Sequence, residues 1–149
     1  MRAVVQRVKN ASVKVDGELI GEIGRGIMLL LAVNVDDEDK DFNYIFSKIL
    51  NLRIFDDEKG LMNKSLKDEG LELLVVSQFT LYGDGRKGNR PSYIKAAKAE
   101  KATYYYEKFI EEAKKEGIKT DHGKFGANME VSLINDGPVT ILLDSSKDF

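Results

Sequence analysis

The 149-residue sequence predicts a single α+β domain, residues 1–149, in which a mainly antiparallel sheet is covered by two packed helices. Three observations predict this class. Short segments alternate apolar and polar residues or are apolar throughout, as strands do, and two longer segments place apolar residues at helical spacing. No repeat, linker or low-complexity stretch divides the chain. With 42% hydrophobic and 32% charged residues, the composition is that of a globular domain that can bury a core.

The first third of the chain is predicted to form strands. Residues 3–8 begin one strand, and residues 11–15 alternate apolar and polar side chains with period two. The turn-forming pair Asp16-Gly17 then connects this segment to residues 19–23, as in a hairpin. Residues 27–33 are apolar at nearly every position, which is typical of a strand covered on both faces.

A helix from about residue 37 to residue 50 is predicted next. Residues 36–39 are all acidic and lie where the N-terminus of a helix favours negative charge. We interpret them as a helix-capping feature rather than a metal site. Further strands are predicted at residues 53–55 and 71–79, with turn-rich sequence between them.

A second helix is predicted from about residue 99 to residue 116, with Gly117 where a C-terminal cap is expected. The three tyrosines at 104–106 fall in phase with its apolar stripe, so they are interpreted as core residues rather than as a base-stacking cluster. The stripe consists of Ala102, Tyr105, Tyr106, Phe109, Ile110 and Ala113.

The last two strands are predicted at residues 129–134 and 139–143. The sequence Asn-Asp-Gly-Pro at 135–138 separates them and is interpreted as a turn, because proline has no N–H for a sheet ladder. Gly137-Pro138 is also a bond at which a cis peptide is possible, although only about 5% of X–Pro bonds in folded proteins are cis.

Several kinds of chemistry are excluded by composition. The absence of cysteine excludes disulfides, a thiolate nucleophile and sulfur-based metal sites, and a metal would have to be held by carboxylates alone. The single histidine, His122, lies in a polar segment and is interpreted as solvated rather than catalytic. We therefore predict no cofactor and no metal. The longest apolar run, 27–33, is about a third of a membrane span, and no signal peptide is apparent, so a cytoplasmic protein that does not enter a membrane is expected.

Two further segments have features beyond packing. At residues 77–81 small polar groups interrupt the end of an apolar strand: either the strand emerges into solvent, or it presents N–H groups and hydroxyls to a ligand, with Thr80 as a nucleophile or anchor. Between residues 83 and 101 a basic excess suits contact with a phosphate backbone, and equally an ordinary solvated loop. Its basic residues are Arg86, Lys87, Arg90, Lys95, Lys98 and Lys101, against Asp84 and Glu100.

Taken together, these segments resemble the D-aminoacyl-tRNA deacylase family (the D-tyrosyl-tRNA deacylase type). The sequence Ser-Gln-Phe-Thr-Leu at 77–81 matches one family signature, and Asn-Asp-Gly-Pro-Val-Thr at 135–140 matches the other. Residues 5–8, 21–24 and 90–92 also look like family positions. The resemblance spans essentially the whole chain, and the two signatures together, in order and at this separation, are highly specific.

The resemblance implies a β-barrel-like fold and a two-fold homodimer whose active site is shared across the interface. It implies a cis Gly137-Pro138 bond that reaches into the partner's site, and the 3′ end of aminoacyl-tRNA as substrate. The catalytic residues implied are Ser77, Gln78, Phe79 and Thr80. The substrate-binding residues implied are Gly137, Pro138, Arg7, Phe125 and Met129. Of these, Arg7, Phe125 and Met129 line or brace the adenosine pocket.

The activity implied is hydrolysis of the ester of D-aminoacyl-tRNA, and of glycyl-tRNA mischarged on tRNA-Ala, with rejection of L-aminoacyl-tRNA. In the family the 2′-hydroxyl of the terminal adenosine is thought to assist, with backbone N–H groups near Phe79 binding the oxyanion; Thr80 as a covalent nucleophile is the rival idea. Two alternative functions stay open. One is that of a relative with a trans Gly-Pro bond that acts on small L-aminoacyl-tRNA, and the other is a module that binds RNA ends without cleaving them.

Overall fold

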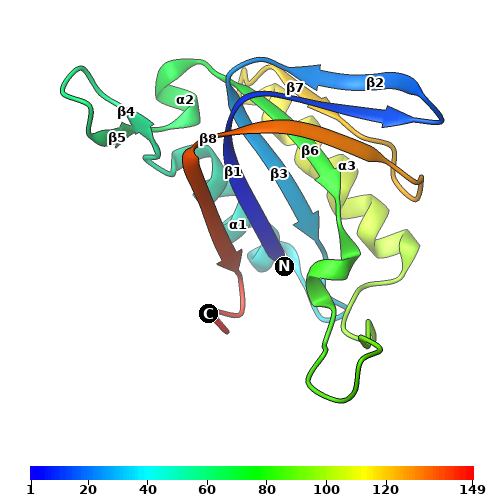
Figure 1. The fold of residues 1–149 in the computed structure, drawn as a ribbon. Helices are drawn as coiled ribbons and strands as arrows, with labels where there is room; N and C mark the ends of the chain where they lie inside the picture. Colours follow the sequence, from blue (N-terminus) through cyan, green and yellow to red (C-terminus); the bar gives the residue numbers. More distant parts are fainter.

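The computed structural model describes residues 1–149, which form a nearly closed, barrel-like mixed sheet with helices outside it (Figure 1). The main sheet runs in the order β2-β1-β3-β6-β7, and β8 pairs with β1. The strands are β1 (Arg2–Val15), β2 (Glu18–Ile23), β3 (Gly26–Ala32), β6 (Glu72–Ser77), β7 (Thr120–His122) and β8 (Glu130–Asp144), with a separate hairpin of β4 (Phe55–Asp56) and β5 (Met62–Lys64). The helices are α1 (Asp39–Asn51), α2 (Leu66–Glu69) and α3 (Ala99–Lys115), and η1 (Phe79–Tyr82) is a 3₁₀ turn.

The two strands predicted at 3–8 and 11–15 are one long strand, β1. Its first half pairs with β3 and its second half with β2, both antiparallel, while β8 runs along most of its length. The register of the β8 pairing shifts near Val8 and Asn10, where the strand bends. This bend lets one strand take part in both parts of the curved sheet.

The prediction of a mainly antiparallel sheet is only partly correct, because the sheet is mixed. Strand β6 is parallel to β3 and to β7. Each of these connections contains a helix, α1 and α2 in the first and α3 in the second, and a helical crossover returns the chain to the same end of the sheet. Apolar periodicity predicts a strand but carries no information about the direction of its neighbour.

Both long helices are confirmed, but the structure has a third. The short helix α2 was missed because its four residues are too few to show helical periodicity; it begins at Ser65, whose hydroxyl accepts the Asp68 N–H in a capping box. The acidic run before α1 is indeed a cap: Glu38 and Asp41 form a reciprocal capping box at its N-terminus. None of the helices has the length and apolar content required to cross a membrane.

Strands β3 and β6 are covered on both faces, as the apolar run at 27–33 predicts. Side chains on one face, such as Leu29 and Val75, pack in the large core beneath α1 and α3. Those on the other face, such as Met28 and Val76, pack in a smaller core against the first part of β8. The two layers hold β6 from both sides, so the position where its chain leaves the sheet is rigidly defined.

The turn predicted at 135–138 is wrong, because these residues lie inside β8. Val8 pairs with Asn135 and Gln6 with Thr140, so six residues of β8 stand opposite three of β1, as in a large bulge. The Gly137-Pro138 peptide within it is cis, as the family resemblance implies. A proline without an N–H is tolerated there because β8 is bonded to β1 alone and its other edge is free.

Candidate active site at the end of strand β6

A cavity of about 480 Å³ opens where β6 ends. Its walls come from the end of β3, the turn η1, the start of α3 and residues 125–131. The lining is mostly apolar, and its polar side chains are those of Ser77, Gln78, Asn128 and Tyr106. A concave, largely apolar pocket with a few converging polar groups is the usual form of a small-ligand site.

The turn η1 begins at this cavity with main-chain donors that no hydrogen bond within the turn uses. The Gln78 N–H still donates to the Leu31 carbonyl, 2.8 Å away, as a continuation of the sheet. The first bond of the turn runs from the Leu81 N–H to the Gln78 carbonyl, at 3.2 Å. The N–H groups of Phe79 and Thr80 precede that bond and have no acceptor within the turn, as is general at helix starts. These two donors can bind an oxygen that carries negative charge.

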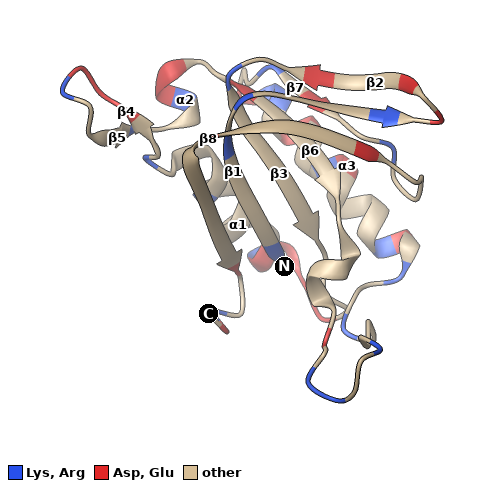
Figure 2. Ribbon diagram, in the orientation of Figure 1, with Lys and Arg blue, Asp and Glu red and all other residues tan.

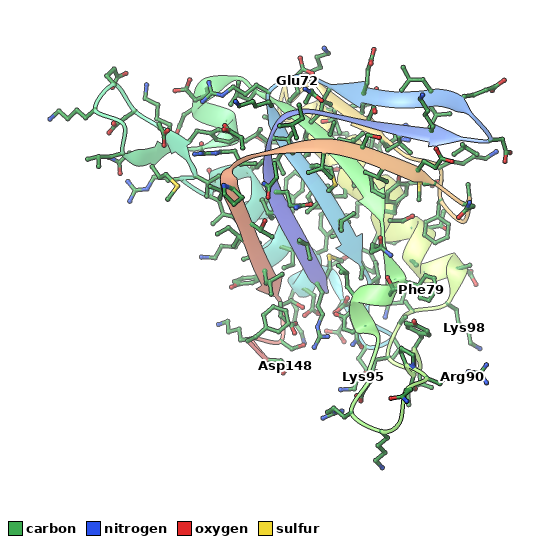
Figure 3. All side chains as sticks on the ribbon, viewed as in Figure 1. Glu72, Phe79, Arg90, Lys95, Lys98 and Asp148 are labelled. Atoms are coloured by element: carbon green, nitrogen blue, oxygen red, sulfur yellow. The ribbon has the colours of Figure 1, made fainter.

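The side chains of residues 77–80 differ in whether they line the cavity. Ser77 and Gln78 are half-buried and line the cavity, together with Phe79. Thr80 is exposed and is not part of the lining; its hydroxyl accepts a short hydrogen bond from the Gln78 amide. Phe79 itself is 57% exposed and stands at the end of the sheet beside the loop that follows η1 (Figure 3).

Phe125 and Met129, predicted to belong to the substrate pocket, both line this cavity. Tyr106 was predicted only as a core residue, yet it supports the same wall: its hydroxyl lies 3.2 Å from the carbonyl oxygens of both Val75 and Gly123 and shares its one proton between them. Burial raises the pKa of the Tyr106 hydroxyl well above its usual range, so it stays protonated as a donor. Its position in the helical stripe resembles that of any core aromatic, and no sequence signal distinguishes it.

Arg7, Gly137 and Pro138 form a second cluster, away from this cavity in the same chain. The buried Arg7 guanidinium donates to the Ile54 carbonyl at 2.7 Å and to the Asp136 carbonyl at 3.2 Å. It lies so close to Gly137 that a Cβ at that position would be 3.1 Å from Nη2. The structure therefore attaches the bulge of β8 to the body of its own subunit through Arg7.

The pairing registers show how far apart the two signatures lie. Arg7 stands opposite Ile27 on β3, whereas Ser77 stands opposite Leu31. Four residues of strand span about 13 Å, and β8 is also three strands away from β6 in the sheet. One chain thus brings together Ser77, Gln78, Phe79, Phe125 and Met129, and separately Arg7, Gly137 and Pro138.

His122, interpreted from the sequence as solvated, is half-buried in β7 and lies outside the lining of the cavity. Its Nδ1 is 2.6 Å from the Gly123 carbonyl oxygen, and its ring meets the Tyr106 ring edge-on. It has no contact that would make it a general base for a group bound near Phe79.

Comparisons with known proteins agree on one family. The family model described as "D-Tyr-tRNA(Tyr) deacylase" matches residues 4–144. A D-aminoacyl-tRNA deacylase of Thermosipho africanus is 57% identical to this chain and one of Clostridium kluyveri is 58% identical, each over the full length of both chains.

Two solved structures share the fold. A structure titled "c-Myc DNA Unwinding Element Binding Protein" is 47% identical, with a TM-score of 0.90 over 97% of this chain and 98% of that one. A probable eukaryotic D-amino acid tRNA deacylase, 18% identical, shares the fold with a TM-score of 0.82 over 96% and 98% of the two chains. The resemblance found in the two signatures is thus confirmed over the whole sequence, and the chain belongs to the D-Tyr-tRNA(Tyr) deacylase family.

Proposed function

We propose that this protein hydrolyses the ester bond of D-aminoacyl-tRNA, releases the free D-amino acid and tRNA, and rejects L-aminoacyl-tRNA. The observation that carries the proposal is the apolar cavity at the start of η1, where the N–H of the lining residue Phe79 has no acceptor within the turn, in a chain of this family. We further propose that it acts in the cytoplasm as a chirality proofreader for translation, and that glycyl-tRNA mischarged on tRNA-Ala is also a substrate.

The active form that we propose is a two-fold dimer. Because Gly137 and Pro138 lie far from the cavity of their own chain, they can take part in catalysis only in another chain's site. Strand β8 offers a free edge for such contact, and on it Ile134 and Leu142 are 52% and 58% exposed. Exposed apolar residues on an unpaired strand favour burial against a second copy. The size of the solution species, measured by light scattering, tests this arrangement.

Selection by chirality requires exclusion rather than recognition. D-amino acids differ in their side chains, so a pocket that fits one of them cannot serve all, whereas a rigid wall can refuse every L side chain. In the proposed dimer the main chain at Gly137-Pro138 forms that wall and holds the α-amino group. A D side chain then projects outward and its identity has little effect. Glycine has no side chain to exclude, so it is accepted.

The chemistry that we propose depends on main-chain N–H groups and on a hydroxyl of the substrate rather than on catalytic side chains. The tetrahedral intermediate of ester hydrolysis carries an oxyanion, which the N–H groups of Phe79 and Thr80 stabilise; one donor of this kind is worth about 100- to 1000-fold in rate in other hydrolases. The 2′-hydroxyl of the terminal adenosine assists the attack, and the apolar walls orient the ester. Thr80 is then a neighbour of the reaction rather than its nucleophile.

The function is tested by hydrolysis of D-tyrosyl-, L-tyrosyl- and glycyl-tRNA side by side, without added metal. We expect rapid release from the D and glycyl forms and none above background from the L form. Resistance of glycyl-tRNA alone would refute the exclusion mechanism. Release of small L-residues such as alanine would indicate the relative with altered chirality, and binding without any release would indicate an RNA-end-binding module.

Thr80→Ala is expected to retain activity within about tenfold of the wild type, because the main-chain N–H at residue 80 remains and general orientation effects are unchanged. The measurement is the first-order rate constant for hydrolysis of D-tyrosyl-tRNA in a single turnover, with enzyme in excess. Thr80→Ser is the matched control, since it restores a hydroxyl. A loss of several thousand-fold in the alanine variant, rescued by serine, would instead establish Thr80 as the nucleophile.

A further inference from the structure

The loop of residues 83–98, between η1 and α3, carries most of the unpaired positive charge near the cavity. It contains five basic residues and one acidic residue. Arg86 is neutralised by Asp84, whose carboxylate lies 2.5 Å from the guanidinium. The remaining cations of the loop make no ion pair and are all exposed; they are Lys87, Arg90, Lys95 and Lys98.

Eight of the eighteen basic residues elsewhere make ion pairs within the fold. Lys67 binds Glu116, Lys108 binds Asp39, and Lys119 binds Glu72, with N–O distances of 2.8 to 3.0 Å. Figure 2 shows several blue segments along the 83–98 loop, which extends from the lower end of the molecule. Net charge is only −2, so this local group of cations, rather than the overall charge, is what an anionic partner would meet.

The loop is attached directly to the wall of the cavity. The Ala97 N–H donates to the Val33 carbonyl at 2.8 Å, and the Val35 N–H donates to the Lys95 carbonyl at 2.9 Å. Ala97 itself lines the cavity. The returning half of the loop, which carries Lys95 and Lys98, is therefore fixed beside the cavity, at the same end of the molecule as Phe79 (Figure 3).

Exposed aromatic surface accompanies these charges. The Phe79 and Tyr93 rings meet edge-to-face with centroids 5.3 Å apart, and both remain accessible, at 57% and 39%. Ile94 beside them is 86% exposed. Proteins that bind single-stranded nucleic acid commonly combine cations with accessible aromatic rings. The phosphates contact the cations, and the bases stack on the rings.

We propose that the 83–98 loop and the Phe79–Tyr93 pair bind the unpaired 3′ segment of the tRNA and its adjoining phosphates, and so guide the aminoacylated end into the cavity. This proposal rests on the proposed function, since it names the surface that receives that substrate. Lys87, Arg90, Lys95 and Lys98 contact phosphates, which gives affinity without dependence on base sequence. Tyr93 stacks on a base that precedes the terminal adenosine.

The test is the salt dependence of binding of uncharged tRNA, measured by fluorescence anisotropy. In R90A/K95A, the slope of log K against log salt concentration should fall by roughly 1.4 to 1.8, since each lost phosphate contact removes about 0.7 to 0.9. The matched control is R25A/K114A, which also removes one exposed, unpaired arginine and lysine. Arg25 lies at the far end of the sheet, where its carbonyl accepts the Glu72 N–H, and the control slope should equal that of the wild type.

Tyr93→Leu tests the proposed stacking of a base independently of the phosphate contacts. It should weaken tRNA binding by about fivefold or more with the salt slope unchanged, because stacking of one base contributes on the order of 1–3 kcal/mol. An unchanged slope in R90A/K95A, or equal loss in R25A/K114A, would overturn the loop proposal. Hydrolysis of D-tyrosyl-tRNA by the wild type is a separate readout, so failure of the loop proposal and failure of the proposed function are distinguishable.

Discussion

Replacement of Gly137 by alanine is expected to lower kcat for D-tyrosyl-tRNA by on the order of 100-fold, since a displacement of about 1 Å in a positioning element costs that much. Gly137 has a φ of +120°, a conformation that residues with a side chain rarely adopt. An alanine Cβ would also lie 2.9 Å from Val139 Cγ2 and 3.1 Å from Arg7 Nη2. The main chain of the bulge must therefore shift, and with it the wall that we propose for the partner's site.

The matched control for Gly137→Ala is Gly24→Ala, outside both the cavity and the 83–98 loop. A Cβ at Gly24 meets nothing closer than Glu72 Oε1 at 3.9 Å, and no unusual φ is required there. The control should keep wild-type kcat, and both variants should keep the wild-type circular dichroism spectrum, because Gly137 lies on an exposed edge. Full activity of Gly137→Ala in the dimer would contradict the assignment of this bulge to the site.

The second large effect is expected on stability, at Gly26, where β3 and β6 begin their parallel pairing opposite Glu72. A Cβ at this position would overlap the Glu72 carbonyl oxygen and come within 2.7 and 2.9 Å of the Glu72 carbonyl carbon and nitrogen. These are main-chain atoms of a strand that is held by hydrogen bonds to its neighbour, so they cannot rotate away. Gly26→Ala should therefore destabilise the protein by about 3 kcal/mol or more, at the upper end of the overpacking range.

Thermal unfolding followed by circular dichroism measures this loss. A change of about 3 kcal/mol corresponds to a fall in Tm of roughly 6–12 °C for a chain of this size. Gly24→Ala, two residues away, is the control, since its Cβ would meet nothing closer than Glu72 Oε1 at 3.9 Å and its N–H bond to that carboxylate would remain. Equal Tm values for the two variants would show that β3 and β6 can separate at little cost.

Much of this fold is predictable from local sequence. The apolar run at 27–33 indicates a strand buried on both faces, and the stripes of the two long helices indicate their inner sides; all three are confirmed. What local sequence does not contain is the direction and partner of β6, because these depend on where α1 and α3 return the chain. The shortest elements, such as α2 and β7, are missed because each spans less than two periods of its pattern, so no repeat is visible in the sequence.

The candidate site shows the same division. Ser77, Gln78 and Phe79 could be located by their signature, and they do meet at one cavity. Residues 135–140 could be identified as a family signature, but their position inside a strand could not be predicted. A proline after a glycine indicates a turn unless the neighbouring strand is known. Tyr106 was missed because a hydroxyl that bonds to main-chain carbonyls leaves no trace in the periodicity of a helix.

The donors at the start of η1 belong to the main chain, and this affects how such a site can evolve. Every residue except proline carries an N–H, so almost any substitution at positions 79 and 80 leaves both donors in place. Genetic drift can therefore change the side chains there while the donors that we propose to stabilise the oxyanion persist. For the same reason, a scan that replaces one side chain at a time would report these positions as tolerant, although their main-chain N–H groups are the ones on which the proposed chemistry depends.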